Sequence, residues 1–497
     1  MRRLRLAAGA ALILLVVAGV LARAGMTRRW VEGLVGESRP VQLRVWDWWS
    51  PSTNEEYGDY FDAVEAGFEA RNPDVDVVLQ IVPFGTYVQK LSTAMVGDSP
   101  PDVFQSSVYW AEGFYQRGML RPLNDLLEAD GAAPGTPGHI GREAFLAPAW
   151  RHNQTEAGVV FGIPQIIDAS CLLWNLDILQ EAAAEDDEIR DLFARQADGS
   201  VDWLRLRWDA VTNWDHFRRI ARKLTRRDAE GEVVQAGFVL SASSGAGLFS
   251  PWLAANGGRF QDSAGTRALF ARPAGVETAE FLARLYWVDR VCPPFQRQLT
   301  NSELFKERRA ACIAAGTWSG KDIMRDTMGW GHFSKTAFPP GPRGDGPATV
   351  TWGNMLVITR RCPNVEAAWR YLKFVCGLEG NLLRSQHLGY NGPRHDFYES
   401  RRWAEALAER PYLSNVRQIC LAGDKLRHTE IIAVDHQANP VVETVLLRYP
   451  QIAAGEGPYA SVAEALARAA RDVDSVYRRY GEQVARWLAA RQEPAPR

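Results

Sequence analysis

Strands and helices are predicted to alternate over residues 41–118, and this alternation is the feature that most constrains the fold. Apolar residues occupy every second position over 41–46, a pattern typical of a strand that enters a buried sheet. Aromatic residues at helical spacing follow and end at an Asn-Pro pair, which predicts a helix. The later elements expected in this region are strands over 75–82 and 102–104 and helices over 87–96 and 108–118. This order predicts a parallel sheet with helices on both faces.

A second α/β series begins near residue 159, and no linker separates it from the first. Its predicted strands cover 159–164, 171–175, 237–240, 312–315 and 355–359. The charged, aperiodic stretch at 185–202 predicts a surface insertion, and the apolar periodicity over 462–488 predicts a long amphipathic helix. We therefore expect an α/β protein of two lobes, each a sheet flanked by helices, with the chain crossing between them more than once. The expected boundaries are 41–158 plus 350–398 for lobe 1 and 159–349 plus 399–490 for lobe 2.

The first thirty residues are predicted to be an export signal. Three arginines precede an uncharged apolar run over 6–21, and the small-residue motif Ala-Arg-Ala at 22–24 offers a cleavage site. Arg28 and Arg29 follow that site, which favours the alternative of an uncleaved membrane anchor. No cysteine occurs before Cys171, so we expect no lipoprotein anchor. The predicted location is periplasmic or extracellular, either free or tethered by that anchor.

Tryptophan is the one unusual feature of the composition, with 18 copies in 497 residues. Most tryptophans pack in protein cores, but an excess of this size leaves some for a binding surface. The formal net charge of -2 gives no reason to expect nucleic acid as a partner.

The six cysteines are scattered and form no CxxC pair, a spacing that is wrong for zinc. We expect mostly buried free thiols, with room for one disulfide whose partners the sequence does not select. No metal or cofactor is predicted.

Several short motifs follow one another along the chain: VWDWW at 45–49, FEARNP at 68–73, GDSPPDV at 97–103, FGIP at 161–164, WNLDIL at 174–179 and AAWRYLKF at 367–374. Their order resembles that of the family-1 extracellular solute-binding proteins, the maltose-binding type. Each motif alone is weak, but their shared order spans residues from about 41 to about 478. The insertion at 185–202 departs from the family pattern. The resemblance implies the two-lobed type II periplasmic-binding-protein fold, a monomer whose lobes close about a hinge.

The resemblance also implies a function without catalysis: capture of a sugar or oligosaccharide for the permease subunits of an inner-membrane ABC importer. A sugar presents C–H faces and a rim of hydroxyls, so its site combines flat aromatic side chains with hydrogen-bonding polar ones. Such groups collect at the carboxyl ends of strands in open α/β sheets. The candidate ligand-binding residues are Trp48, Trp49, Ser106, Trp110, Gln165, Asp168, Ser244, Trp252, Trp318, Trp352, Asn354 and Arg394.

Some of these candidates have a competing structural interpretation. The resemblance places Trp318 under a sugar ring and Asp168 as a hydroxyl acceptor, although Asp168 could instead cap a turn. Trp48 and Trp49 should point to different sides of the strand, so one is expected to pack and the other to face the cleft. Ser106 could be a plain helix cap.

Two other classes of function stay open on the sequence. A binding protein for a non-sugar solute, such as a polyamine, iron or an anionic ligand, would use the same fold, and Arg394 could pair with an anion. A glycoside hydrolase would need two carboxylates at a fixed separation, for which Asp47, Asp102 and Asp168 are the candidates. No nucleophile elbow or phosphate loop is present, so an enzyme is not expected.

Overall fold

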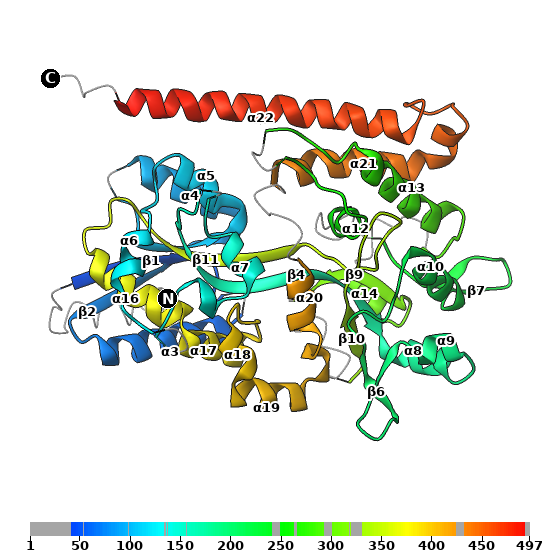
Figure 1. Cartoon of the computed structure of the whole chain (residues 1–497), viewed down its shortest axis with the longest axis horizontal. Coiled ribbons are helices and arrows are strands. Elements are labelled where there is room, and N and C mark those ends of the chain that lie inside the picture. The colour runs from blue at the N-terminus through cyan, green and yellow to red at the C-terminus, as the bar shows by residue number, and fades with distance from the viewer. Residues whose placement is uncertain are drawn as a thin grey trace, which may run out of the picture.

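The computed structural model describes residues 41–492, apart from residues 53, 98, 134–135, 137, 156, 241–248, 263–265, 293–300, 318, 320–330 and 424–431. The predicted export signal therefore lies outside the described residues. Figure 1 shows the two α/β halves side by side, with strand β4 running between them.

The helices alternate with the strands over residues 41–116, and they are the only described elements that follow the last strand. They are α3 (Glu56–Arg71), α4 (Phe84–Val96), α5 (Val108–Gln116), α6 (Asn124–Ala129), η1 (Arg142–Ala144), α7 (Ala147–Arg151), α8 (Leu176–Ala183), α9 (Asp187–Arg190), α10 (Trp214–Lys223), α12 (Ser250–Ala255), α13 (Pro273–Trp287), α14 (Asn301–Lys306), α16 (Val365–Cys376), α17 (Leu378–Leu388), α18 (His395–Glu399), α19 (Arg401–Glu409), η2 (Pro411–Leu413), α20 (Val416–Ala422), α21 (Ile432–Ala453) and α22 (Val462–Gln492).

A seven-stranded sheet forms the framework, in the order β10-β4-β11-β3-β1-β2 with β9 also paired to β4. Its strands are β1 (Val41–Asp47), β2 (Val75–Ile81), β3 (Val103–Ser107), β4 (Ile163–Asn175), β9 (Cys312–Gly316), β10 (Phe333–Thr336) and β11 (Thr351–Ile358). Strand β1 pairs in parallel with β2 and β3, and apolar clusters cover both faces of these strands. The predicted parallel sheet with helices on both faces is confirmed.

Strand β4 joins the two halves of the molecule. Its first part pairs antiparallel with β11, and its second part pairs antiparallel with β9 and β10. The expectation of two separate strands over 159–164 and 171–175 was wrong, because the polar residues between them are buried within one continuous strand. The expected strand over 237–240 forms only isolated bridges, such as that between Val239 and Ile313.

Each half has its own apolar core. One cluster contains Leu43, Phe68 and Trp369, and another contains Trp174, Phe217 and Leu466. Ile163 and Ile166 belong to the first cluster although they follow the expected boundary at residue 158. The lobe boundaries given above stay a prediction.

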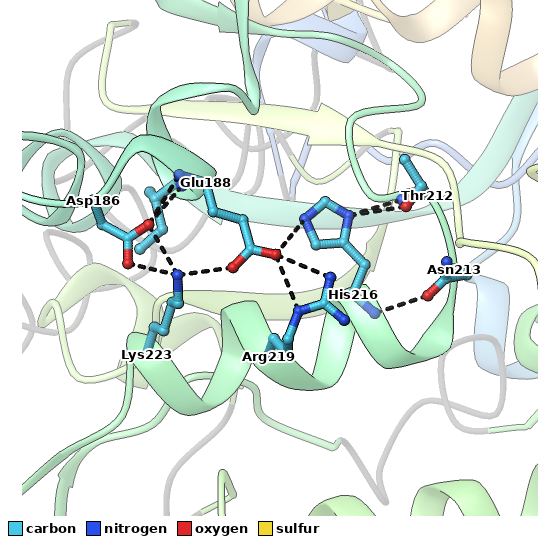
Figure 2. A network of polar contacts seen from close by, with 8 residues as sticks. Asp186, Glu188, Thr212, Asn213, His216, Arg219 and Lys223 are labelled. Carbon is cyan, nitrogen blue, oxygen red and sulfur yellow. Dashed lines mark hydrogen bonds and ion pairs between the residues drawn. The ribbon is translucent and has the colours of Figure 1, made fainter.

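The predicted insertion folds into a short helix and a hairpin. Strands β5 (Phe193–Arg195) and β6 (Val201–Leu206) form the hairpin, and a second small hairpin pairs β7 (Arg226–Arg227) with β8 (Val233–Gln235). Figure 2 shows how α9 is attached to α10: Lys223 contacts both Asp186 and Glu188 at 2.7 Å. The hydrogen bonds from Lys223 hold the pKa of both carboxyl groups below their usual values.

All six cysteines are buried and free, which confirms the expectation of buried thiols and leaves no disulfide. The long C-terminal helix α22 is also confirmed, and it packs on α21 and α13. Within the part of the chain that the structure describes, no helix is both long and apolar enough to cross a membrane.

Candidate functional site

Four neighbouring strands bring polar and aromatic residues to one edge of the sheet. Strands β1 and β3 end there, at Asp47 and Ser107, because they are parallel. Strand β11 begins at the same edge, so that Asn354 lies opposite Ser107. Trp352 lies opposite Asp168 of β4. The candidate site is therefore assembled by strand order rather than by nearness in sequence.

The Asp47 carboxylate organises the turn that follows β1. Its Oδ1 accepts hydrogen bonds from the backbone amides of Trp48 at 2.6 Å and Trp49 at 2.9 Å, and from Nε2 of Gln105 at 3.1 Å. Burial raises the pKa of Asp47 to about 7, against the lowering effect of these two backbone hydrogen bonds. The carboxylate thus fixes the direction in which both tryptophans leave the strand.

An aromatic surface lies beside this turn. The Trp48 ring contacts those of Tyr87 at 5.0 Å, Trp110 at 5.5 Å and Phe84 at 5.8 Å, all edge to face. Tyr87 is buried, whereas Trp48 and Trp110 are partly exposed and Phe84 is 59% exposed. We call Trp48, Phe84 and Trp110 the aromatic edge. Flat exposed rings of this kind can pack on the C–H face of a sugar.

Phe84 was not among the candidates from the sequence. Phe84 begins α4, directly after Pro83 and shortly after the end of β2 at Ile81. Its position just past the carboxyl end of a strand is the sequence signal that could have identified it.

Trp49 packs within the protein. Its indole is stacked between the rings of Tyr57 at 5.8 Å and Tyr390 at 5.3 Å, and it belongs to the core cluster below the sheet. Trp49 is therefore buried and Trp48 partly exposed, and the expectation that Trp48 faces the cleft stays a prediction.

Asp168 lies at the point where β4 passes between the halves, and it is 8% exposed. Its Oδ1 accepts hydrogen bonds from Oγ1 of Thr317 at 2.8 Å and from Nδ2 of Asn391 at 3.3 Å. Among the residues that the structure describes, none donates to its Oδ2. Burial raises the pKa of Asp168 to about 7, while Thr317, Lys335 and Asn391 lower it. Two hydrogen bonds from described residues thus hold Oδ1 in place.

Trp352 and Asn354 belong to β11, where Trp352 is paired with Asp168 of the neighbouring strand β4. The Asn354 side chain is partly exposed and hydrogen bonds to no other side chain or backbone group in the described part of the chain. Trp352 is largely buried and its Nε1 donates to Oγ of Ser170 at 3.1 Å.

Ser106 lies within β3 and Gln165 within β4. Both are buried, and Oγ of Ser106 donates to the carbonyl of Ser107 at 3.1 Å. Their burial is at odds with the expectation that they contact a ligand. The backbone carbonyl of Gln165 accepts a hydrogen bond from Nη1 of Arg384 at 2.6 Å.

The structure corrects the expectations for Trp252 and Arg394. The Trp252 indole is fully buried among Phe217, Phe338 and other rings, so it is a core residue with no surface for a ligand. Arg394 is also buried, because it pairs with Asp396 at 2.6 Å and donates to the carbonyl of His139 at 2.8 Å. An anion has no access to this guanidinium. Ser244 and Trp318 lie outside the described residues.

Of the three carboxylates considered for glycoside hydrolysis, Asp102 lies apart from Asp47 and Asp168. Asp102 precedes β3, at the end of the sheet opposite to Asp47, and it forms an ion pair with Arg44 at 3.0 Å. No group of three His, Cys, Asp or Glu residues suited to a metal ion occurs in the described part of the chain.

The comparison with known families identifies the class of protein. The family model for bacterial extracellular solute-binding proteins matches residues 51–381, and the chain belongs to this family. A binding protein of Brucella abortus is 22% identical over 347 residues, which cover 67% of this chain and 72% of the relative.

Solved structures of similar fold cover most of the chain. The sugar-binding protein MalE of Xanthomonas citri has a TM-score of 0.67 at 19% identity, covering 91% of this chain and 100% of its own. The cyclic alpha-maltosyl-1,6-maltose binding protein of Arthrobacter globiformis has 0.66 at 18%, covering 88% and 99%. UgpB of Mycobacterium tuberculosis, solved in complex with glycerophosphocholine, has 0.66 at 17%, covering 89% and 99%. At these identities the likeness establishes the two-lobed fold and not the ligand.

Proposed function

We propose that this protein captures a sugar or oligosaccharide between its lobes and delivers it to an ABC importer. The observation that carries the proposal is the partly exposed aromatic edge at the end of the sheet where Asp168 and the partly exposed Asn354 also lie. Rings would pack on the sugar face, and the carboxylate and amide would accept or donate hydrogen bonds at its hydroxyl rim.

Closure about the hinge would complete the site. Strand β4 runs between the two halves (Figure 1), so a rotation of the second half about this strand would bring its residues toward the aromatic edge. The closed form would then be the state that the permease recognises, because ligand shifts the population toward it. Two of the similar structures carry sugar-binding names, which supports this ligand class.

A thermal-shift screen of the purified protein tests the proposal. Neutral oligosaccharides would be compared with spermidine, ferric citrate, a uronate and glycerophosphocholine. A ligand that binds only the folded state raises the apparent stability by mass action. We expect a neutral sugar to raise Tm in a concentration-dependent manner. A rise with one of the other solutes and with no sugar would contradict the proposal and favour a binding protein of that other class.

A further inference from the structure

Lys335 on β10 is a fully buried lysine in the second half of the molecule. Lysine is almost never fully buried without a partner, because its ammonium loses hydration. Here Nζ donates to the carbonyl of Thr317 at 2.7 Å and lies 4.6 Å from the centre of the Tyr412 ring. Neither contact is an ion pair, so a salt bridge does not explain why the charge is kept.

Thr317 connects this lysine to the candidate site. Its Oγ1 donates to Oδ1 of Asp168 at 2.8 Å and accepts from the backbone amide of Ala169 at 3.0 Å. Its own amide donates to the carbonyl of Ala169 at 2.8 Å. Lys335 and Asp168 therefore contact the same residue, Lys335 at the backbone carbonyl of Thr317 and Asp168 at its side-chain hydroxyl.

We propose that Lys335 is a positioning residue of the ligand site, which acts through Thr317 to orient the Asp168 carboxylate and to favour its ionised form. This inference rests on the proposed function, because it assigns Asp168 a role in binding. Besides this shared contact with Thr317, the positive charge of Lys335 lowers the pKa of Asp168 and so opposes the effect of burial. Burial in turn lowers the pKa of Lys335 to about 8.

Other titratable or charged groups lie near Lys335 and Asp168, and they also affect how ligand binding depends on pH. They are Cys171 on β4, Cys420 on α20, Tyr412 in η2, Tyr398 on α18 and the nearby Arg417. Burial raises the pKa of both thiols above the usual value, so they stay neutral through the range in which Asp168 titrates. The ionised carboxylate is the stronger acceptor, so affinity is expected to rise with pH as Asp168 loses its proton.

Two substitutions separate the hydrogen bond from the charge. Lys335→Met removes both, whereas Lys335→Gln removes the charge and keeps an N–H donor. Leu466→Ala is the matched control, because Leu466 is buried in the same half but lies in the core cluster away from Thr317. Each variant is titrated by calorimetry from pH 5.5 to 8.5 with a sugar that stabilises the wild type. The Asp168 carboxyl is followed in parallel by carbon-13 NMR, with Asp168→Asn to assign its signal.

We expect Lys335→Met to weaken binding about tenfold near neutral pH and to raise the Asp168 midpoint by about one pH unit. Lys335→Gln should raise the midpoint equally but lose less affinity, and Leu466→Ala should change neither. An unchanged Asp168 midpoint in both folded lysine variants would overturn the inference. If the wild type binds no sugar, the proposed function fails, while the NMR midpoint still decides whether Lys335 controls this carboxylate.

Discussion

Trp48 lies partly exposed at the end of β1, with three aromatic neighbours at ring distances of 5.0–5.8 Å. Asp47 accepts a hydrogen bond from the Trp48 backbone amide and the three neighbouring rings pack against the indole, so the ring is oriented before any ligand arrives. A pre-oriented ring loses little conformational entropy on binding. This makes Trp48 the aromatic side chain most directly suited to a sugar.

Trp48→Ala is expected to weaken ligand binding by about 1–3 kcal/mol, because it removes a stacking face. Calorimetric titration measures the loss. The control is Trp203→Ala on β6, since Trp203 is 40% exposed but lies on the insertion hairpin. Equal affinity of the Trp48 variant and the control would show that Trp48 does not touch the ligand.

Trp252→Ala is expected to behave in the opposite way. Loss of a fully buried indole from an aromatic core costs about 3–5 kcal/mol of unfolding free energy. Urea denaturation measures that cost, and the folded fraction should bind ligand with wild-type affinity. A variant of normal stability with lost binding would restore the original expectation for this residue.

At the scale of elements, the pairing of β11 with β4 depends on Gly353. A Cβ at this position would lie 2.5 Å from the carbonyl oxygen of Ile166, next to a register shift between Asn354 and Met355. Any side chain therefore pushes the two strands apart at the candidate site.

Gly353→Ala is expected to lower the unfolding free energy by about 1–3 kcal/mol. It should also weaken ligand binding, because Asn354 and Asp168 are carried by the two strands. Gly346→Ala is the control, since a Cβ there meets no atom within 4 Å. The comparison uses chemical denaturation and calorimetry, and a Gly353 variant as stable as the control would refute the close-packing argument.

The sequence predicted the elements with clear periodicity and missed those without it. The regular apolar spacing predicted strands β1 to β3 and the helices between them. Trp48 and Trp110 became candidates because they follow the ends of β1 and β3. Strand β4 was divided in error, because Gln165 and Asp168 interrupt its apolar run and their partners come from distant segments. Trp252 looked like a strand-end residue, yet only the packing of α10, α12 and α13 shows that it is enclosed. Lys335 gave no signal, since its burial depends on tertiary contacts alone.

At the scale of the whole molecule, buried carboxyl groups link stability to pH. Burial raises the pKa of Asp47 from 3.8 to about 7, so the folded state keeps this proton when the unfolded chain has lost it. The folded protein then binds more protons between about pH 4 and pH 7, and its stability falls as pH rises through that window. Asp168 acts in the same direction.

The Asp47→Asn variant has no titrating group at position 47. Its free energy of unfolding relative to the wild type should therefore increase as pH rises from 4 to 7. Urea denaturation at intervals across this range measures the difference, with Asp198→Asn on the exposed β5–β6 turn as the control. A difference that stays constant with pH would contradict the burial argument.

The most direct test of sugar capture is a crystal structure of the protein with the oligosaccharide that stabilises it best. We predict a sugar ring packed against Trp48 or Trp110, and a hydroxyl within hydrogen-bonding distance of Oδ2 of Asp168 or the amide of Asn354. A sugar bound elsewhere, with the aromatic edge left open to solvent, would contradict the assignment of this site.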